Sequence, residues 1–292
     1  MGRWNTSDLP DMSGRTVVVT GAARGLGLIT ARELGRVGAR VVLAVRDTAK
    51  GAIAVAGIPG RADVRELDVS DLDSIRRFAR DWSGDLDVLI NNAGIMNVPL
   101  RRTTDGFESQ MATNYFGPFA LTNLLLPHVT DRVVFVSSQL HRQGKVHLGD
   151  LAVPQQPYKA LDAYNDSKLA VVLLSTELQR RLAQEGSPVR SVVAHPGIAS
   201  TDLAMHSRSG QVTNALRFLF NDPERGALSL LYAATQDVPG NAYVGPSGLG
   251  GMRGFPATGK AAPAGVDPDM ARRLWMKTAE LTGTGSGRPA TA

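Results

Sequence analysis

Tyr164 and Lys168 have the residue types and the spacing of an acid–base pair. The segment reads Tyr164-x3-Lys168, and residues four apart lie on one face of a helix, so the phenol and the ammonium would point the same way. A phenol with its ordinary pKa of about 10 exchanges protons poorly at neutral pH, whereas a nearby cation favours the phenolate and lowers that pKa. The pattern predicts proton transfer at Tyr164, although the spacing alone also fits an amphipathic surface pair.

A glycine-rich loop early in the chain is typical of a phosphate-binding site. Gly21, Gly25 and Gly27 follow a short β-branched run, and a helical pattern extends over residues 25–36. Glycine permits a tight turn and lets a pyrophosphate approach the backbone at the helix N-terminus. An ordinary strand–helix turn is the alternative, but the position of the loop at the first strand–helix junction favours dinucleotide binding.

The end of the second β-branched run indicates which dinucleotide is bound. A site for NAD places an acidic residue roughly twenty residues after the glycines, where it binds the ribose 2′-hydroxyl. Val45 stands at that position here and Arg46 follows it, with Arg24 in the glycine loop. Because a guanidinium forms paired, charge-assisted bonds to phosphate, these residues predict NADP. Solvated surface charge is the alternative for both arginines, and Asp47 is either a helix cap or an arginine partner.

Short β-branched runs alternate with helical patterns along the chain, and they define the fold that must position these side chains. The runs cover residues 16–19, 40–45, 64–69, 86–90, 132–136, 191–194 and 242–244. Apolar strands separated by helices are typical of a parallel sheet covered on both faces. We predict an α/β fold, a single doubly wound Rossmann domain with a seven-stranded parallel sheet over residues 1–281, and a disordered tail at 282–292.

Helix starts and one loop are also marked in the sequence. Ser70-x2-Asp73 has the form of a capping box. Asp222-Pro223 and Asp267-Pro268 each place a capping residue before proline at the first helical position. Residues 245–254 are rich in glycine and predict a loop after the last strand.

Composition excludes several classes of protein. The 292 residues are 43% hydrophobic, which is incompatible with a disordered chain. There is no cysteine, so disulfides, thiolate metal sites and a catalytic thiol are excluded, and the five histidines lack metal-ligand spacing. The net charge of +5 is spread along the chain, which argues against nucleic-acid binding. No membrane span or signal segment is apparent, and we expect a cytoplasmic protein with no metal.

Taken together in their order, the motifs resemble those of the short-chain dehydrogenase/reductase family. They are Thr20-Gly21-x3-Gly25-x-Gly27, Asp68-Val69, Asn91-Asn92-Ala93-Gly94, Asn114, Ser137-Ser138, Tyr164-x3-Lys168 and Pro196-Gly197-x3-Thr201. The segments at 44–51 and 114–127 are similar to those of the retinol-dehydrogenase-like branch. The motifs of the family span residues 15–205. The similarity to this branch concerns sequence style, so it does not establish retinol as the substrate.

The resemblance assigns the catalytic roles residue by residue. Tyr164 would donate a proton to a carbonyl oxygen in reduction or remove one from an alcohol in oxidation. Lys168 would lower the pKa of Tyr164 and bind the nicotinamide ribose. Ser138, the second serine of its pair, would hydrogen-bond the substrate oxygen, whereas Ser137 would face the core.

Asn114 adds a local physical argument to its family role. Pro118 removes the helical hydrogen bond to the carbonyl four residues earlier, which belongs to Asn114. The resemblance implies that this carbonyl holds a water in a proton relay to Lys168 and Tyr164. A merely kinked helix is the alternative.

The resemblance also implies which residues contact the cofactor. Asp68 would bond the adenine amino group, Val69 would supply a backbone contact, and Thr201 would hold the carboxamide. The full set is Gly21, Arg24, Gly25, Leu26, Gly27, Arg46, Asp68, Val69, Asn92, Ala93, Gly94, Tyr164, Lys168, Pro196, Gly197, Ile198 and Thr201.

The predicted function is that of an NADP(H)-dependent oxidoreductase acting on a carbonyl or alcohol, with a lipophilic ketone or aldehyde as the favoured substrate. Residues 139–163, 95–100 and the apolar segment after Thr201 would line the pocket. Packing of a helix onto the core is the alternative for that apolar segment. A catalytically silent NADP-binding regulatory protein of the same fold is the alternative. The resemblance further implies a homo-oligomer formed through the helices carrying Asn114 and Tyr164, in which the apolar run 171–174 would serve either that contact or the core.

Overall fold

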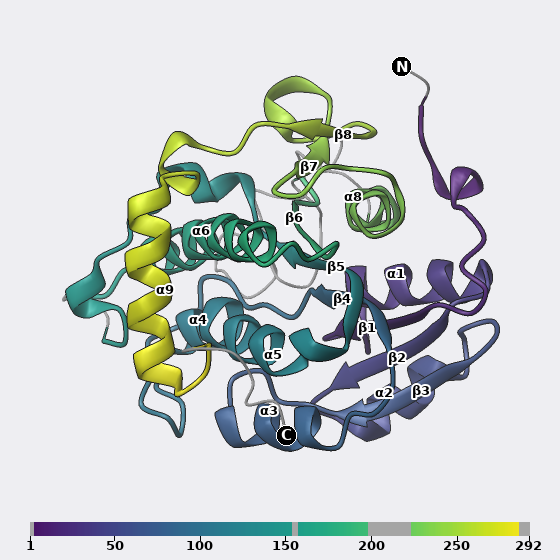
Figure 1. The fold of residues 1–292 in the computed structure, drawn as a ribbon, viewed down its shortest axis with the longest axis horizontal. Helices are drawn as coiled ribbons and strands as arrows, with labels where there is room; N and C mark the ends of the chain where they lie inside the picture. Colours follow the sequence, from purple (N-terminus) through teal and green to yellow (C-terminus); the bar gives the residue numbers. More distant parts are fainter. Residues whose placement is uncertain (1–2, 154–156, 198–222, 286–292) are drawn as a thin grey trace.

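The computed structural model describes residues 3–153, 157–197 and 223–285 (Figure 1). The predicted site residues Ile198 and Thr201, the predicted cap Asp222 and the apolar segment after Thr201 lie outside these ranges. The last helix continues through Thr282, so the described chain includes the beginning of the predicted tail, and residues 286–292 lie outside it.

One sheet of eight strands forms the centre of the described structure, in the order β3-β2-β1-β4-β5-β6-β7-β8. Its strands are β1 (Thr16–Thr20), β2 (Arg40–Val45), β3 (Ala62–Glu66), β4 (Leu86–Asn91), β5 (Val129–Val136), β6 (Arg190–Ala194), β7 (Tyr243–Pro246) and β8 (Pro256–Gly259). The strands β1 to β7 pair in parallel, which confirms the predicted Rossmann architecture.

The prediction of seven strands omits β8, which pairs antiparallel with β7 at the edge of the sheet. Only the first of its four residues is buried. An edge strand that is largely exposed on both faces carries no apolar run, so the sequence pattern could not mark it.

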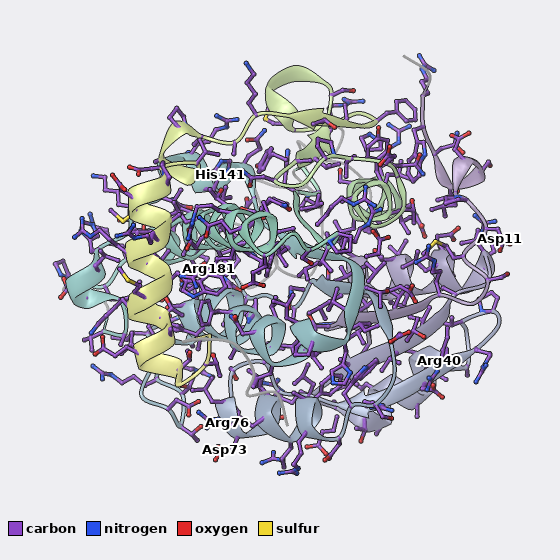
Figure 2. All side chains as sticks on the ribbon, in the orientation of Figure 1. Asp11, Arg40, Asp73, Arg76, His141 and Arg181 are labelled. Carbon is purple, nitrogen blue, oxygen red and sulfur yellow. The ribbon has the colours of Figure 1, made fainter. Side chains whose placement is uncertain are left out.

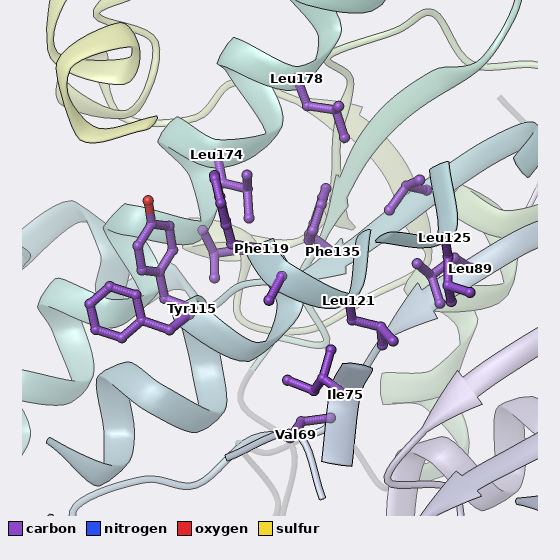
Figure 3. Close-up of a cluster of buried hydrophobic side chains, with 14 of the residues drawn as sticks. Val69, Ile75, Leu89, Tyr115, Phe119, Leu121, Leu125, Phe135, Leu174 and Leu178 are labelled. Carbon is purple, nitrogen blue, oxygen red and sulfur yellow. The ribbon is translucent and has the colours of Figure 1, made fainter. Parts of the chain in front are cut away.

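Helices cover both faces of the sheet, as a doubly wound fold requires (Figure 1). Apolar side chains of α1, α2 and α8 form one buried cluster with the sheet, and those of α3, α5, α6 and α9 form another on the opposite face (Figure 3). The helices are α1 (Gly25–Arg36), α2 (Thr48–Val55), α3 (Leu72–Arg80), α4 (Ser109–Met111), α5 (Gly117–Leu125), α6 (Ala160–Gln184), α8 (Pro223–Thr235) and α9 (Pro268–Thr282). Charged side chains such as Arg40, Asp73 and Arg76 lie at the periphery (Figure 2).

The C-terminal helix α9 packs over α5 and α6. The Trp275 ring meets Phe119 edge-on at 4.8 Å between centroids, and the Tyr115 hydroxyl lies 2.7 Å from the Thr278 hydroxyl. Residues 171–174 of α6 are buried within the single chain. Of the two alternatives for that apolar run, the structure therefore favours the core.

Two of the predicted helix caps can be compared with the structure. Asp267 caps α9, with Pro268 at its first turn, as predicted. The predicted capping box at Ser70 is wrong by one residue, because Asp71 accepts the N–H groups that begin α3. The Ser70 hydroxyl instead donates to Asp68 Oδ1 at 2.6 Å. Among the described helices, none is long and apolar enough to cross a membrane.

Candidate active site

The predicted site residues gather at the carboxyl ends of the central strands. The strand order runs outward in one direction from β1 to β3 and in the other from β4 onward, so the topology changes direction between β1 and β4. Open α/β sheets bind ligands in the crevice outside the strands at such a point. The loops that follow β1, β4 and β5 carry the glycine loop, Asn92–Gly94 and Ser138 to this edge.

The glycine loop forms a backbone cradle at the start of α1. Gly21 and Gly25 have φ values of +67° and +58°, a region that side chains disfavour. A Cβ on Gly27 would stand 2.5 Å from Asn92 Nδ2 and 2.8 Å from the Gly21 carbonyl oxygen. The side chain of Arg24 does not cap α1, so the first N–H groups of the helix, from Gly25 onward, have no side-chain acceptor. Such a helix start fits the pyrophosphate of a dinucleotide.

Thr20 joins the glycine loop to the segment after β4. Its hydroxyl oxygen accepts the backbone N–H groups of Asn92 at 3.0 Å and Ala93 at 2.9 Å. The Asn92 side chain donates to the Thr20 carbonyl at 2.8 Å. A Cβ on Gly94 would lie 3.1 Å from Asn114 Oδ1 and 3.5 Å from Lys168 Nζ, so this segment borders the catalytic residues as well. The sequence motif includes Thr20, but its two accepted hydrogen bonds emerge only in three dimensions.

Arg46 lies at the end of β2, where the sequence predicts the 2′-phosphate. Its side chain is 78% exposed and its Nη1 lies 3.8 Å from Asp68 Oδ2. Asp68 also accepts the Ser70 N–H at 2.9 Å. Asp47 caps α2 by accepting the Lys50 N–H at 3.0 Å, and its carboxylate lies 2.7 Å from Lys50 Nζ. The alternatives for Asp47 therefore resolve to a helix cap.

Val69 is buried and its carbonyl packs against the start of α5. A Cβ on Gly117 would collide with that carbonyl, so the glycine allows the two segments to approach. Packing against α5 therefore holds the backbone at Val69, which directly follows Asp68.

Ser138 and Tyr164 meet at the end of β5. The two side chains are close enough for the Ser138 hydroxyl to lower the pKa of the Tyr164 phenol, and Lys168 Nζ lies 5.7 Å from the centre of the Tyr164 ring. The Ser137 hydroxyl instead donates to the Lys168 carbonyl at 2.8 Å and is buried. The structure therefore places Ser138, and not Ser137, beside the phenol, as predicted.

Burial changes the proton affinities of Tyr164 and Lys168. It raises the pKa of Tyr164 to about 12, with a partial offset from the hydrogen bond to Ser138, and it lowers the pKa of Lys168 to about 8. The expected net lowering of the Tyr164 pKa is therefore wrong for this structure, because burial outweighs any stabilisation of the phenolate by the Lys168 ammonium. The Lys168 ammonium donates to the Val136 carbonyl at 2.9 Å, and loss of hydration disfavours the charged form of both groups.

Asn114 lies in a π-helical turn, Ala112–Phe116, that ends just before Pro118. The Gly117 N–H bonds the Ala112 carbonyl, one residue beyond the α-helical partner. The proline signal thus correctly predicted a distorted helix, because proline cannot donate to the carbonyl four residues earlier. The proton relay through Asn114 remains a prediction.

The Asn114 side chain connects three segments of the site. Its Nδ2 donates to the Ile95 carbonyl and to Ser167 Oγ, both at 2.9 Å, while its Oδ1 accepts the Ile95 N–H at 2.9 Å. Ser167 in turn donates to the Tyr164 carbonyl at 2.7 Å. Ser167 stands inside the Tyr-x3-Lys motif, but nothing in the spacing indicated this contact.

Pro196 and Gly197 follow β6, where the nicotinamide contacts are predicted. Gly197 has a φ of +74°, and its N–H donates to His195 Nδ1 at 3.3 Å. His195 is buried and its ring stacks on Tyr243 at 5.0 Å between centroids. Burial lowers the pKa of His195 to about 3, so this histidine is neutral.

An apolar groove of about 520 Å³ lies between α6 and the β7–β8 pair. Its lining includes Val172, Val193, Ala261 and Val266, and none of the predicted site residues. The groove is therefore separate from the substrate pocket that the sequence predicts. Within the described ranges, no group of His, Asp and Glu side chains is placed to hold a metal ion.

A parallel Rossmann sheet, a glycine cradle at its first helix and a Ser–Tyr–Lys constellation together define an oxidoreductase of the dinucleotide-binding class. The family model for short chain dehydrogenases matches residues 15–212. The chain belongs to the short-chain dehydrogenase/reductase family, in its retinol-dehydrogenase-like branch.

Individual relatives extend the comparison over nearly the whole chain. Mouse polyprenol dehydrogenase is 40% identical, with 96% of this chain and 87% of the relative covered. Mouse retinol dehydrogenase 14 is 38% identical, with 90% and 84% covered. A crystal structure of an uncharacterised protein from Mycobacterium paratuberculosis is 49% identical, covers 97% of this chain and 98% of its own, and has a TM-score of 0.87. A Pseudomonas aeruginosa NADP active-site complex is 26% identical, covers 77% and 91%, and has a TM-score of 0.62.

Proposed function

We propose that this oxidoreductase uses NADP(H) and reduces a lipophilic ketone or aldehyde. The observation that carries the proposal is that Ser138, Tyr164 and Lys168 converge at the carboxyl edge of the sheet, on the same edge as the glycine cradle. When bound, the nicotinamide supplies or accepts the hydride, and the protein must orient the reacting carbonyl and move its proton.

Ser138 and Tyr164 supply the polar groups for that carbonyl. Two neighbouring hydroxyls can both turn to one substrate oxygen, which polarises the carbonyl and holds it near the phenol. With its pKa raised to about 12, Tyr164 is protonated at neutral pH, which suits the donor role in reduction. Lys168, within 5.7 Å of the ring centre, would stabilise the phenolate that forms.

Three observations favour NADP over NAD. The position expected to carry an acid is Val45, and the Asp47 carboxylate is taken up by the cap of α2 and by Lys50. Arg46 is largely exposed at the end of β2 and is available for a phosphate. The Pseudomonas aeruginosa relative was solved with NADP.

The lipophilic substrate class is supported by relatives. The polyprenol and retinol dehydrogenases are named for long apolar alcohols, and each covers at least 90% of this chain. Carbonyl reduction is proposed as the working direction, because the protonated phenol is poised to donate.

A screen of NADPH and NADH oxidation against aldehydes, ketones and quinones of increasing chain length tests cofactor and substrate together. We expect NADPH to be preferred and longer apolar carbonyls to be turned over more efficiently. Tyr164→Phe should reduce kcat by a factor on the order of 100 or more, since it removes the proton donor and leaves the ring. Full turnover by this variant would refute the mechanism, and a preference for NADH would refute the role of Arg46.

A further inference from the structure

His141 is buried directly behind Ser138, and the proposed mechanism does not use it. The residue lies in the 3₁₀ turn Gln139–Gln143 that follows Ser138, is 1% exposed, and lies beside α6 (Figure 2). Its Nδ1 lies 2.6 Å from the Ser138 carbonyl oxygen. Its Nε2 lies 2.9 Å from the backbone nitrogen of Ala262, beyond β8.

These two contacts determine where the imidazole carries its proton. A backbone N–H can only donate, so Nε2 must accept from Ala262 and be unprotonated. The ring proton then sits on Nδ1 and is donated to the Ser138 carbonyl. Burial lowers the pKa of His141, so the imidazole is neutral, as the two contacts require.

The neighbouring side chains join the same two segments. Gln139 Nε2 donates to the Gly250 carbonyl at 2.8 Å, and Arg142 Nη2 donates to the Lys260 carbonyl at 2.6 Å. Tyr243 of β7 packs its ring 5.1 Å from His141, with its hydroxyl 3.2 Å from Nδ1. The turn after Ser138 is thus hydrogen-bonded to residues on both sides of β8. Of the three side chains that make these bonds, His141 is the one that also contacts Ser138.

Ser138 has little else in the described structure to hold its peptide in place. Its hydroxyl accepts the Leu140 N–H at 3.2 Å, and this group must stay free to turn toward Tyr164 and a substrate. Its carbonyl accepts the His141 backbone N–H at 3.1 Å and the His141 ring. A shift of that carbonyl would carry the hydroxyl away from Tyr164.

We propose that His141 is a positioning residue, which clamps the Ser138 peptide against Ala262 so that the serine hydroxyl faces Tyr164. The inference rests on the proposed function, because it requires Ser138 to bind the substrate oxygen. It makes the edge strand β8 and the segment after it part of the support for catalysis.

Two substitutions test the Nδ1 contact and the Nε2 contact of His141 separately. In His141→Asn the amide reaches the position of Nδ1 and can still donate to the Ser138 carbonyl, whereas in His141→Gln it reaches the position of Nε2 and can still accept from Ala262. Both remove the ring, so they serve as matched controls for lost packing. We expect His141→Gln to lower kcat about tenfold, the equivalent of one lost hydrogen bond in the transition state, and His141→Asn to lower it less.

Neither variant should change the KM for NADPH, because His141 hydrogen-bonds none of the predicted cofactor residues within the described ranges. An unchanged kcat in His141→Gln, or a greater loss in His141→Asn, would overturn the proposal. If Tyr164→Phe keeps full turnover, or if no carbonyl is reduced by the native protein, it is the proposed function that fails.

A measurement on the native protein tests the clamp without turnover or variant folding. Nitrogen-15 NMR of labelled histidine distinguishes the two neutral tautomers, and NADPH titration helps to place the signals of the five histidines. A proton on Nδ1 of the buried His141 is expected. A proton on Nε2, or a ring that titrates near neutral pH, would contradict the clamp.

Discussion

Gly27→Ala is the sharpest test of the glycine cradle. The added Cβ would stand 2.5 Å from Asn92 Nδ2, 2.8 Å from the Gly21 oxygen and 3.0 Å from Ala22 Cα. Two of these three atoms belong to the backbone, and Asn92 is itself held by its 2.8 Å bond to the Thr20 carbonyl. The methyl group can therefore be accommodated only if the start of α1 moves away from the loop after β4.

That movement should lower both the free energy of unfolding and the affinity for NADPH. Overpacking of this kind costs about 1–3 kcal/mol of folding free energy, and each kcal/mol lowers the Tm by about 2–4 °C in a large domain. Displacement of one N–H from a phosphate forfeits a hydrogen bond to a charged group, which is a loss of roughly ten- to a hundredfold in NADPH affinity. We expect both effects in the variant.

Calorimetric titration with NADPH and a thermal melt of the ligand-free protein measure the two effects separately. Gly84→Ala is the matched control, because Gly84 has a φ of +79° with no atom within 4 Å of an added Cβ and lies before β4, away from the cradle. It should lower the Tm and leave the affinity unchanged. If Gly27→Ala binds NADPH within twofold of the native protein, the cradle does not hold the phosphates.

Two further predictions concern charged groups. Arg46→Ala should raise the KM for NADPH about ten- to a hundredfold and leave that for NADH unchanged, since only NADPH carries the 2′-phosphate. The matched control is Arg40→Ala, which removes an arginine paired with Asp63. If Arg46→Ala raises the KM for NADPH and for NADH equally, the assignment of Arg46 to the 2′-phosphate is refuted. Lys168 has a folded pKa of about 8 against an ordinary value of 10.5, so the unfolded state binds more protons between these values. Measured by urea titration, the free energy of unfolding of the native protein should therefore rise by about 2 kcal/mol from pH 8 to 10 relative to that of Lys168→Met. A difference in unfolding free energy that does not change with pH would contradict the burial of this ammonium.

Local patterns were sufficient for most of the sheet and for the elements that carry the site. The strands β1, β2 and β4 to β7 lie close to their predicted ranges, because each is a buried apolar run bounded by turn residues. The predicted third strand, 64–69, begins two residues earlier and ends three residues earlier, at Glu66. Asp68 accepts the Ser70 N–H in a turn instead of continuing the strand.

The burial of particular side chains and the contacts between them could not be predicted from local sequence patterns. Helical spacing placed Tyr164 and Lys168 on one face, but it does not report burial, and burial reverses the expected change in the Tyr164 pKa. His141 lies within the segment 139–163 that was predicted to line the pocket, and no spacing singled it out. Its role depends on Ala262, a residue 121 positions away that the sheet brings to it.

The sequence by itself indicated the family, the parallel sheet, the glycine loop and the candidate residues Ser138, Tyr164 and Lys168, because all of these are expressed in short-range spacing and in apolar periodicity. The tertiary structure alone decided three matters: that β8 pairs at the edge of the sheet, that α9 packs over α5 and α6, and that the predicted catalytic pair is desolvated. Each of these depends on contacts between segments far apart in the chain, and such contacts leave no local signal.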